Sequence, residues 1–301
     1  MSSAAPTKKR LRTNTLPARK GVVSWLRPFF TTTVGMKATT AVTGTLLTGF
    51  VIVHLIGNLK VLDGPKAINA YAQFLKELGP WLWVARGGLL AVFVLHIVLA
   101  LTLAWKARAA RPVGYHYAKT IQATIASRTM PWTGLTILAF AAFHLAHFTF
   151  AWVEKVPARS KVTGQMRESS FLDLIDDQNR PDVYTMVVKG FENPYVSAIY
   201  IVAMLLLFVH LKHGIGSVFQ SLGLNTPRIQ PFIRRLSLAL AAAICLGNIG
   251  IVVLVWAGEV PIDPTPITTA GAEDRPRPLP PGATGPGAPK IDPKASAPKA
   301  K

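Results

Sequence analysis

Residues 81–105 read WLWVARGGLLAVFVLHIVLALTLAW, an apolar segment that contains one charged residue, Arg86, and one histidine, His96. A helix needs about 20 apolar residues to cross a bilayer, so this segment is long enough to span a membrane. The same criterion is met by four further segments, roughly residues 36–59, 131–153, 194–219 and 236–258. The sequence therefore predicts an all-α fold, an integral membrane bundle of five transmembrane helices.

The composition agrees with a membrane protein, because 50% of the 301 residues are hydrophobic and only 16% are charged. We expect no cleaved signal peptide, since no short apolar stretch with a small-residue cleavage site precedes the first span. The lone cysteine, Cys245, lies in the fifth span. A single cysteine excludes an internal disulfide and a cysteine-ligated iron–sulfur cluster within the chain.

The charge distribution predicts the orientation of the chain. Residues 1–35, 106–130 and 220–235 contain Lys and Arg but no acidic residue, and they fall on alternate sides of successive spans. By the positive-inside rule these segments are cytoplasmic, so the N-terminus is expected inside and the C-terminus outside. This pattern explains the net charge of +19 by topology and anionic lipid, without a nucleic-acid partner.

Three regions follow from this topology. Residues 1–35 form a basic cytoplasmic arm that Pro17 and Pro28 are expected to break, and residues 36–258 form the membrane domain. Residues 154–193 are expected to be a polar external loop. Residues 259–301 are rich in Pro, Gly and Ala and are expected to be a disordered external tail.

Four of the spans each carry a histidine deep in the apolar segment: His54, His96, His144 and His210. A polar ring left unpaired in hydrocarbon costs roughly 2–7 kcal/mol, so an ionisable residue inside a span is a candidate for function. Two neutral imidazoles that face each other provide the axial ligands of a six-coordinate haem iron. The four histidines therefore predict two haem b groups.

The depth of each histidine predicts the pairs. His54 and His144 lie past the midpoints of spans that run outward, so both belong to the outer half of the membrane. His96 and His210 lie past the midpoints of spans that run inward, so both belong to the inner half. At a rise of 1.5 Å per residue the two levels are on the order of 10–20 Å apart. We expect an outer haem held by His54 and His144 and an inner haem held by His96 and His210.

Other readings of these histidines stay open at this stage. A membrane histidine can instead form an interhelical hydrogen bond, which would make the chain a haem-free scaffold or transporter. His147 and His213 each follow a proposed ligand by three residues on nearly the same helical face, so either could replace its neighbour or bind a haem propionate. The pair Thr43-Gly44 stands ten residues before His54, and Thr133-Gly134 stands ten before His144, which predicts matching depths for these two histidines.

Several short motifs resemble one known family, the cytochrome b membrane subunit of succinate:quinone oxidoreductases in its single-anchor, dihaem class. The resemblance covers roughly residues 30–258. It rests on the spacings from Thr43-Gly44 to His54, from Thr133-Gly134 to His144 and from Tyr200 to His210, on His96 and its Ala-rich following turn, and on the motifs His54-Leu55-Ile56-Gly57-Asn58, Asn69-Ala70-Tyr71-Ala72-Gln73-Phe74 and Gly223-Leu224-Asn225-Thr226-Pro227.

The resemblance implies a subunit of succinate dehydrogenase or fumarate reductase in the bacterial cytoplasmic (inner) membrane. It implies His54, His144, His96 and His210 as haem ligands, a flavoprotein and an iron–sulfur subunit as partners on the cytoplasmic face, and menaquinone as the membrane substrate. The dicarboxylate chemistry would belong to the partner subunits. By analogy the quinone site lies near the outer haem, with Glu77 as a candidate for proton exchange.

Where some dihaem fumarate reductases carry a glutamate two residues before the fourth-span histidine, this chain has Phe208, which argues against a proton pathway through that acid. The alternative within the enzymes is the haem-b quinone subunit of a formate dehydrogenase or hydrogenase. A molybdenum or nickel partner, in place of a flavoprotein, would identify that alternative.

Overall fold

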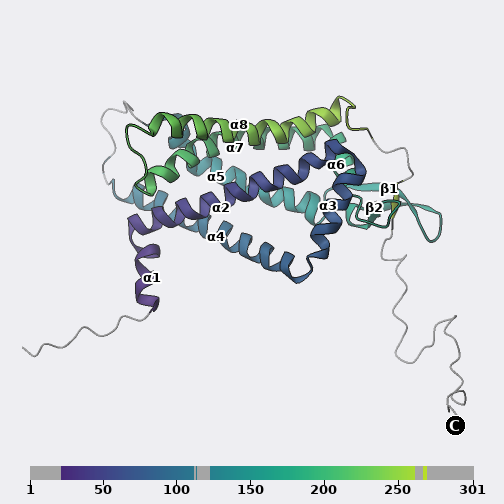
Figure 1. Cartoon of the computed structure of the whole chain (residues 1–301), viewed down its shortest axis with the longest axis horizontal. Coiled ribbons are helices and arrows are strands. Elements are labelled where there is room, and N and C mark those ends of the chain that lie inside the picture. The colour runs from purple at the N-terminus through teal and green to yellow at the C-terminus, as the bar shows by residue number, and fades with distance from the viewer. Residues whose placement is uncertain (1–21, 112, 114–122, 262–266, 270–301) are drawn as a thin grey trace, which may run out of the picture. The chain divides into compact units, whose positions relative to one another are not determined.

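The computed structural model describes residues 22–111, 113, 123–261 and 267–269 (Figure 1). Five helices are long and apolar enough to cross a membrane, which confirms the predicted number of spans. They are α2 (Thr33–Leu59) with its 3₁₀ extension η1 (Lys60–Asp63), α4 (Pro80–Ala109), α5 (Ile125–His144) with the π-helical turn η2 (Leu145–Thr149), α7 (Pro194–Ser221) and α8 (Gln230–Trp256).

Most of these helices extend beyond the apolar segments seen in the sequence. α5 begins at Ile125, six residues before the predicted start at residue 131, and includes Pro131. Backbone hydrogen bonding continues a helix into polar flanks such as Arg128, whereas an apolar-length criterion stops where polar residues begin. The short helix α1 (Val22–Thr31) includes Pro28, so this proline does not break the arm as expected. Residues 1–21, with Pro17, lie outside the described residues.

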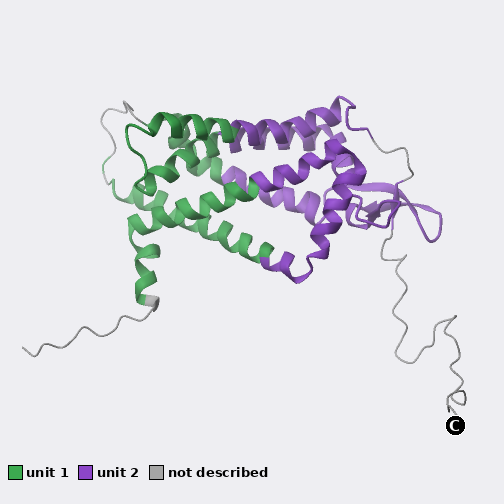
Figure 2. Ribbon diagram, viewed as in Figure 1, with its two compact units in different colours: residues 1–51, 85–134, 209–241 green, residues 52–84, 135–208, 242–301 purple. Residues whose placement is uncertain are grey.

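The chain divides into two compact units, and each of the five long helices contributes to both (Figure 2). The first unit comprises residues 1–51, 85–134 and 209–241, and the second comprises residues 52–84, 135–208 and 242–301. The predicted pair His96 and His210 falls in the first unit, and the pair His54 and His144 falls in the second.

The first unit joins its helices through close approaches of small residues. A β-carbon at Gly35 in α2 would clash with the carbonyl oxygen of Pro28, so glycine allows the close approach of the backbone where α1 meets α2. A β-carbon at Gly216 in α7 would lie 3.6 Å from the Ser237 hydroxyl oxygen of α8. Small residues at such contacts are what membrane helices use to pack tightly.

The second unit has a large hydrophobic core. Its buried residues come from η1, from α3 (Pro65–Glu77), from α6 (Val183–Glu192) and from the adjoining ends of α7 and α8; they are Val61, Ile68, Tyr184, Val188, Phe191, Val196, Tyr200, Ile251, Val252, Val255 and Val260. In the same unit, Leu55 of α2 fills the space over Gly247 of α8, where a β-carbon would lie 2.8 Å from it.

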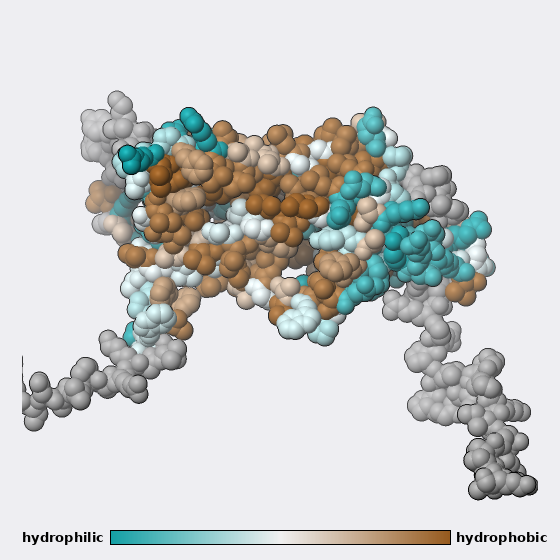
Figure 3. Space-filling model, in the orientation of Figure 1, coloured by the Kyte–Doolittle hydropathy of each residue, from teal (hydrophilic) through white to brown (hydrophobic). Residues whose placement is uncertain are grey.

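Large apolar side chains also lie on the outside of the helices, as a membrane protein requires. Val53 is 59% exposed, Val94 is 50% exposed and Leu246 is 68% exposed. Figure 3 shows hydrophobic residues over the long helices and hydrophilic residues gathered over the sheet of the second unit. Lipid can cover such apolar surface, whereas a soluble monomer rarely exposes so much of it.

The expectation of an all-α fold is wrong for the segment that was predicted to be an external loop. Within it lie three strands, β1 (Lys155–Ser160), β2 (Met166–Ser170) and β3 (Leu174–Ile175), the last two separated by a short 3₁₀ turn, η3 (Phe171–Asp173). Together with β4 (Thr268–Thr269) they form a sheet in the order β2-β1-β4-β3. β1 pairs antiparallel with β2 and parallel with β4, and β3 pairs antiparallel with β4.

We call residues 154–193 together with 267–269 the cap. Its small core consists of Val156, Ala158, Phe171 and Leu174 packed with Ala151, and Met186 and Ile267 cover it. Residues 267–269 belong to the segment that was expected to be disordered, whereas residues 262–266 and 270–301 of that segment lie outside the described residues. The cap is therefore a folded element of the second unit.

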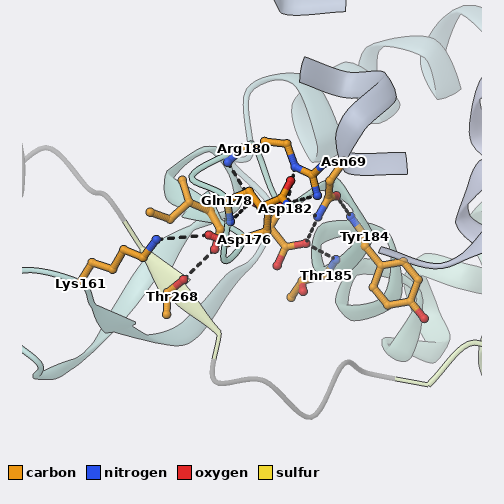
Figure 4. A network of polar contacts seen from close by, with 10 residues as sticks. Asn69, Lys161, Asp176, Gln178, Arg180, Asp182, Tyr184, Thr185 and Thr268 are labelled. Atoms are coloured by element: carbon orange, nitrogen blue, oxygen red, sulfur yellow. Dashed lines mark hydrogen bonds and ion pairs between the residues drawn. The ribbon is translucent and has the colours of Figure 1, made fainter. Parts of the chain in front are cut away.

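Asn69 of α3 is one of the residues that tie the cap to the helices of the second unit (Figure 4). It is fully buried, and its amide nitrogen donates to Asp182 at 3.1 Å and to Asp176 at 3.4 Å. Its amide oxygen accepts from the backbone N–H of Tyr184 at 3.0 Å. The motif residue Asn69 thus has a structural partner for its donor and its acceptor.

Arg180 holds Asp176 in place beside Asn69. Burial acts to raise the pKa of Asp176, but hydrogen bonds from the Arg180 backbone and guanidinium outweigh it, so the pKa lies below its ordinary value of 3.8. The carboxylate therefore stabilises the cap above pH 3.8, and this contribution is lost as the pH falls through the lowered folded-state pKa.

Replacing Asn69 by alanine is expected to loosen the cap. The buried N–H of Tyr184 would lose its acceptor, and leaving such a group unpaired costs about 1–3 kcal/mol. Hydrogen–deuterium exchange in detergent should become faster over β3 and α6. The control is Gln73→Ala, because Gln73 of the same helix bonds only the exposed Glu77 among the contacts described. Equal exchange in the two variants would contradict this role of Asn69.

Candidate functional site

In the first unit, Thr43 of α2 fixes the ring of His96 in α4. The Thr43 hydroxyl lies 2.9 Å from the carbonyl oxygen of Thr39 and 3.1 Å from that of Thr40, so its single proton is donated within its own helix. Its oxygen lies 3.1 Å from Nδ1 of His96, and the same ring also bonds to the backbone of Thr40. A hydroxyl that donates within its own helix accepts from Nδ1 of His96. This direction puts the His96 proton on Nδ1 and the lone pair on Nε2.

The same arrangement recurs between Thr133 of α5 and His210 of α7. Thr133 donates to the carbonyl oxygen of Met130 at 3.1 Å or of Thr129 at 3.3 Å, and its oxygen lies 3.2 Å from Nδ1 of His210. The same direction of hydrogen bonding puts the His210 proton on Nδ1. Since Thr133 contacts His210, this geometry favours His210 over His213 as the residue with a free Nε2.

The glycine after each threonine makes room for the same ring. A β-carbon at Gly44 would lie 3.1 Å from Cε1 of His96, and one at Gly134 would lie 3.5 Å from Cε1 of His210. Along the sequence, each Thr-Gly pair precedes the histidine of its own span by ten residues. The structure relates each pair to a histidine of another helix, which a pattern read along one helix could not reveal.

In the second unit, His54 of α2 and His144 of α5 face each other. Their ring centroids lie 5.7 Å apart and their planes are inclined by 86°. A metal–imidazole nitrogen bond is about 2.0–2.1 Å, so two imidazoles on opposite sides of one metal have centroids roughly 6 Å apart. The separation of His54 and His144 therefore fits two axial ligands of one iron.

The first unit provides a donor set of the same kind. His96 and His210 both belong to it. Each has Nδ1 beside a threonine hydroxyl, and neutral imidazole nitrogen is the usual haem ligand. The residues present in each unit thus fit a bis-histidine haem.

His147 has a different environment from His144. It is completely buried, its Nδ1 lies 3.1 Å from the Tyr200 hydroxyl and its Nε2 lies 3.4 Å from a carboxylate oxygen of Glu154. Both of its ring nitrogens are thus engaged. His144 contacts the same Tyr200 hydroxyl through Nδ1 at 3.1 Å. The geometry therefore favours His144 over His147 as the ligand.

Aromatic rings enclose this group of polar side chains. Phe148 stacks on His147 with centroids 4.0 Å apart, and Tyr200 lies edge-on to its phenylalanine neighbours. The phenylalanines with centroids within 6.0 Å of Tyr200 are Phe140, Phe143, Phe148 and Phe191. Such an apolar surround strengthens the hydrogen bonds inside it, because it excludes water.

Two local features of the backbone bring His147 into this position. The π-helical turn Leu145–Thr149 directly follows His144, and π turns of this kind are frequent at functional sites. Gly190 of α6 gives the space, since a β-carbon there would lie 3.0 Å from Cε1 of His147.

Tyr200, Glu154 and Gly190 were not candidate site residues in the sequence, where Tyr200 served only as the start of a spacing. Their contacts with His147 join residues from α5, α6, α7 and the start of the cap, and no local pattern encodes such contacts. Glu77, the candidate for proton exchange, is exposed at the end of α3 and accepts a hydrogen bond from Gln73 at 2.8 Å.

No protein-family model, curated protein or solved structure matches this chain.

The variant Gly190→Ala is expected to destabilise the second unit. The new methyl group would lie 2.9 Å from Phe148 and 3.0 Å from His147, and overpacking of this kind costs about 1–3 kcal/mol. The midpoint of thermal unfolding in detergent, followed by circular dichroism, should fall. Gly250→Ala is the matched control, because nothing lies within 4 Å of the new methyl group there. A midpoint for Gly190→Ala at or above that of Gly250→Ala would contradict the close packing.

Proposed function

We propose that this chain is the dihaem cytochrome b membrane subunit of a succinate:quinone oxidoreductase. It would carry electrons between a flavoprotein–iron–sulfur pair and menaquinone. The observation that supports this best is the state of the histidine rings. Nδ1 of His96, His144 and His210 each lies against a hydroxyl oxygen, and His54 faces His144 at a distance suited to one iron.

Each residue of the two donor sets has a definite task in this proposal. His96 and His210 would hold one haem, and His54 and His144 would hold the other. When bound, each haem would supply a one-electron redox centre within the membrane. Thr43 and Thr133 orient His96 and His210 and keep their Nε2 atoms unprotonated. The neighbouring glycines keep the space beside these rings clear of side chains.

The partners and the location follow from the resemblance together with the charge pattern. The three acid-free basic segments, residues 1–35, 106–130 and 220–235, would face the cytoplasm of a bacterium. The flavoprotein and the iron–sulfur subunit would dock on that face and perform the dicarboxylate chemistry. Menaquinone would react on the side of the outer haem, and the five apolar helices would hold the chain in the cytoplasmic membrane.

Haem per polypeptide in the purified chain tests this proposal, with visible redox spectra of the wild type and of four single His→Ala variants. Two haems per chain are expected. The variants of His54 and His144 should lose one haem, and those of His96 and His210 should lose the other. A well-folded wild type without any cytochrome b signal would overturn the proposal and favour the haem-free scaffold.

Co-purification identifies the partners in the same experiment. A flavoprotein with succinate-dependent reduction of the haems is expected. A molybdenum or nickel enzyme in its place would assign the chain to a formate dehydrogenase or hydrogenase.

Thr43→Val is expected to weaken binding of the inner haem. The isosteric side chain removes the Thr43 hydroxyl beside Nδ1 of His96, and loss of such a partner typically lowers metal affinity 10–100-fold. Haem retention during dilution should fall for one of the two haems. Thr45→Val is the matched control, because Thr45 donates only to the carbonyl oxygen of Ala41 in the same helix among the contacts described. Equal retention in the two variants would contradict the orienting role of Thr43.

A further inference from the structure

We propose that Glu154, His147 and Tyr200 form a hydrogen-bonded relay that ties His144 to a carboxylate of the cap and increases the electron-donor strength of His144. This inference rests on the proposed function, in which His144 is a haem ligand. All four residues belong to the second unit.

The direction of every hydrogen bond in the relay follows from its end at Glu154. One carboxylate oxygen of Glu154 accepts from the Asn193 amide at 2.8 Å, and the other lies 3.4 Å from Nε2 of His147. An ionised carboxylate can only accept, so Nε2 of His147 carries the proton. Nδ1 of a neutral His147 then has a lone pair and accepts from the Tyr200 hydroxyl, 3.1 Å away.

The last bond of the relay reaches His144. The Tyr200 hydroxyl has one proton, which is donated to His147, so its oxygen accepts from Nδ1 of His144 at 3.1 Å. His144 is therefore left with Nε2 unprotonated, on the side available to a metal. His147 has the opposite tautomer from His144, which explains why two histidines three residues apart have different roles.

The relay differs in kind from the partners of His96 and His210. The threonine hydroxyls that hold those two rings pass their protons to neutral backbone carbonyls. The Tyr200 hydroxyl instead passes its proton toward an anion. A carboxylate behind a ligating histidine raises the basicity of the ligand, and cooperative hydrogen bonds extend this effect along a chain.

Because the relay is largely buried, solvent does little to screen the effect of the Glu154 charge on His144. His147 is fully buried and Tyr200 is buried, whereas His144 is partly buried and the Glu154 side chain is 18% exposed. An anion that increases electron donation from His144 stabilises ferric iron over ferrous iron. Removing the anion or interrupting the relay is therefore expected to raise the midpoint potential of the haem held by His54 and His144.

Redox titrations of the purified full-length chain test the relay. Glu154→Gln removes the charge, and Tyr200→Phe removes the hydroxyl but keeps the charge. Both variants should shift the midpoint potential of the outer haem to more positive values. The inner haem serves as an internal control in each sample and should not shift.

Glu192→Gln provides the matched control for the charge. Glu192 is a carboxylate of the same cap that pairs with Lys189 at 3.0 Å, and its replacement should leave both potentials unchanged. A shift in Glu154→Gln without one in Tyr200→Phe would mean that the charge acts through space, which would overturn the relay. If neither variant shifts the midpoint potential, these residues have only a structural role, and the relay is overturned as well.

A second measurement separates failure of the relay from failure of the haem assignment. If the wild-type chain holds no haem, the proposed function fails, but ¹⁵N spectra of histidine-labelled protein still report the tautomers. The relay predicts the Nε2–H tautomer for His147 and the Nδ1–H tautomer for His144, with each signal assigned by a single His→Gln variant. Both histidines in the same tautomer would overturn the relay without reference to haem.

Discussion

An imidazole ring inside an apolar helix bundle has two nitrogens with opposite needs, and the arrangement of this chain depends on meeting both. The protonated nitrogen needs an acceptor, and the other nitrogen needs a donor or a metal, since an unpaired polar group in hydrocarbon costs roughly 2–7 kcal/mol. Three hydroxyls, those of Thr43, Thr133 and Tyr200, lie at Nδ1 of four histidines, because the Tyr200 hydroxyl contacts both His144 and His147. Within the described residues, no buried side-chain nitrogen or oxygen lacks a hydrogen-bond partner.

The two kinds of hydroxyl lead to two kinds of site. A threonine in a helix can donate its proton to a carbonyl one turn back, so Thr43 and Thr133 need no further partner. A tyrosine hydroxyl lies too far from its own backbone for such a bond. Tyr200 therefore requires another acceptor, which is His147, and His147 in turn requires Glu154. Because the hydroxyl belongs to a tyrosine, the second unit needs a longer series of hydrogen-bonded polar residues than the first.

The apolar length of the segments was sufficient to predict the five spans, because hydropathy depends only on local composition. The sheet could not be predicted in the same way. β1 contains Pro157 and charged residues, and β4 is only two residues long and comes from a Pro-rich tail. Asn69 shows the same limit, because it contacts Asp182 over 113 positions of sequence and no local pattern encodes that distance.

Only part of the histidine site could be predicted from the spacing of residues along the sequence. The depths of the four histidines in their spans predicted two pairs. Each pair lies within one compact unit of the structure. Helical periodicity could not distinguish His144 from His147, because residues three apart lie on nearly the same face of an α-helix, whereas the spacing of the family that the chain resembles favours His144. The distinction comes from a π turn after His144, from the space at Gly190 and from a carboxylate at the start of the cap.

The folded cap therefore has a functional meaning that its polar sequence did not indicate. Glu154 begins the cap and Asn193, which donates to Glu154, follows its last helix, so the carboxylate keeps its position only while the cap is folded. The partners of His96 and His210 lie within the long helices and need no such support. A change that loosens the cap should reach His144 through Glu154, His147 and Tyr200, while His96 and His210 keep their threonines. In the proposed relay, the electron-donor strength of His144 therefore depends on the stability of the cap.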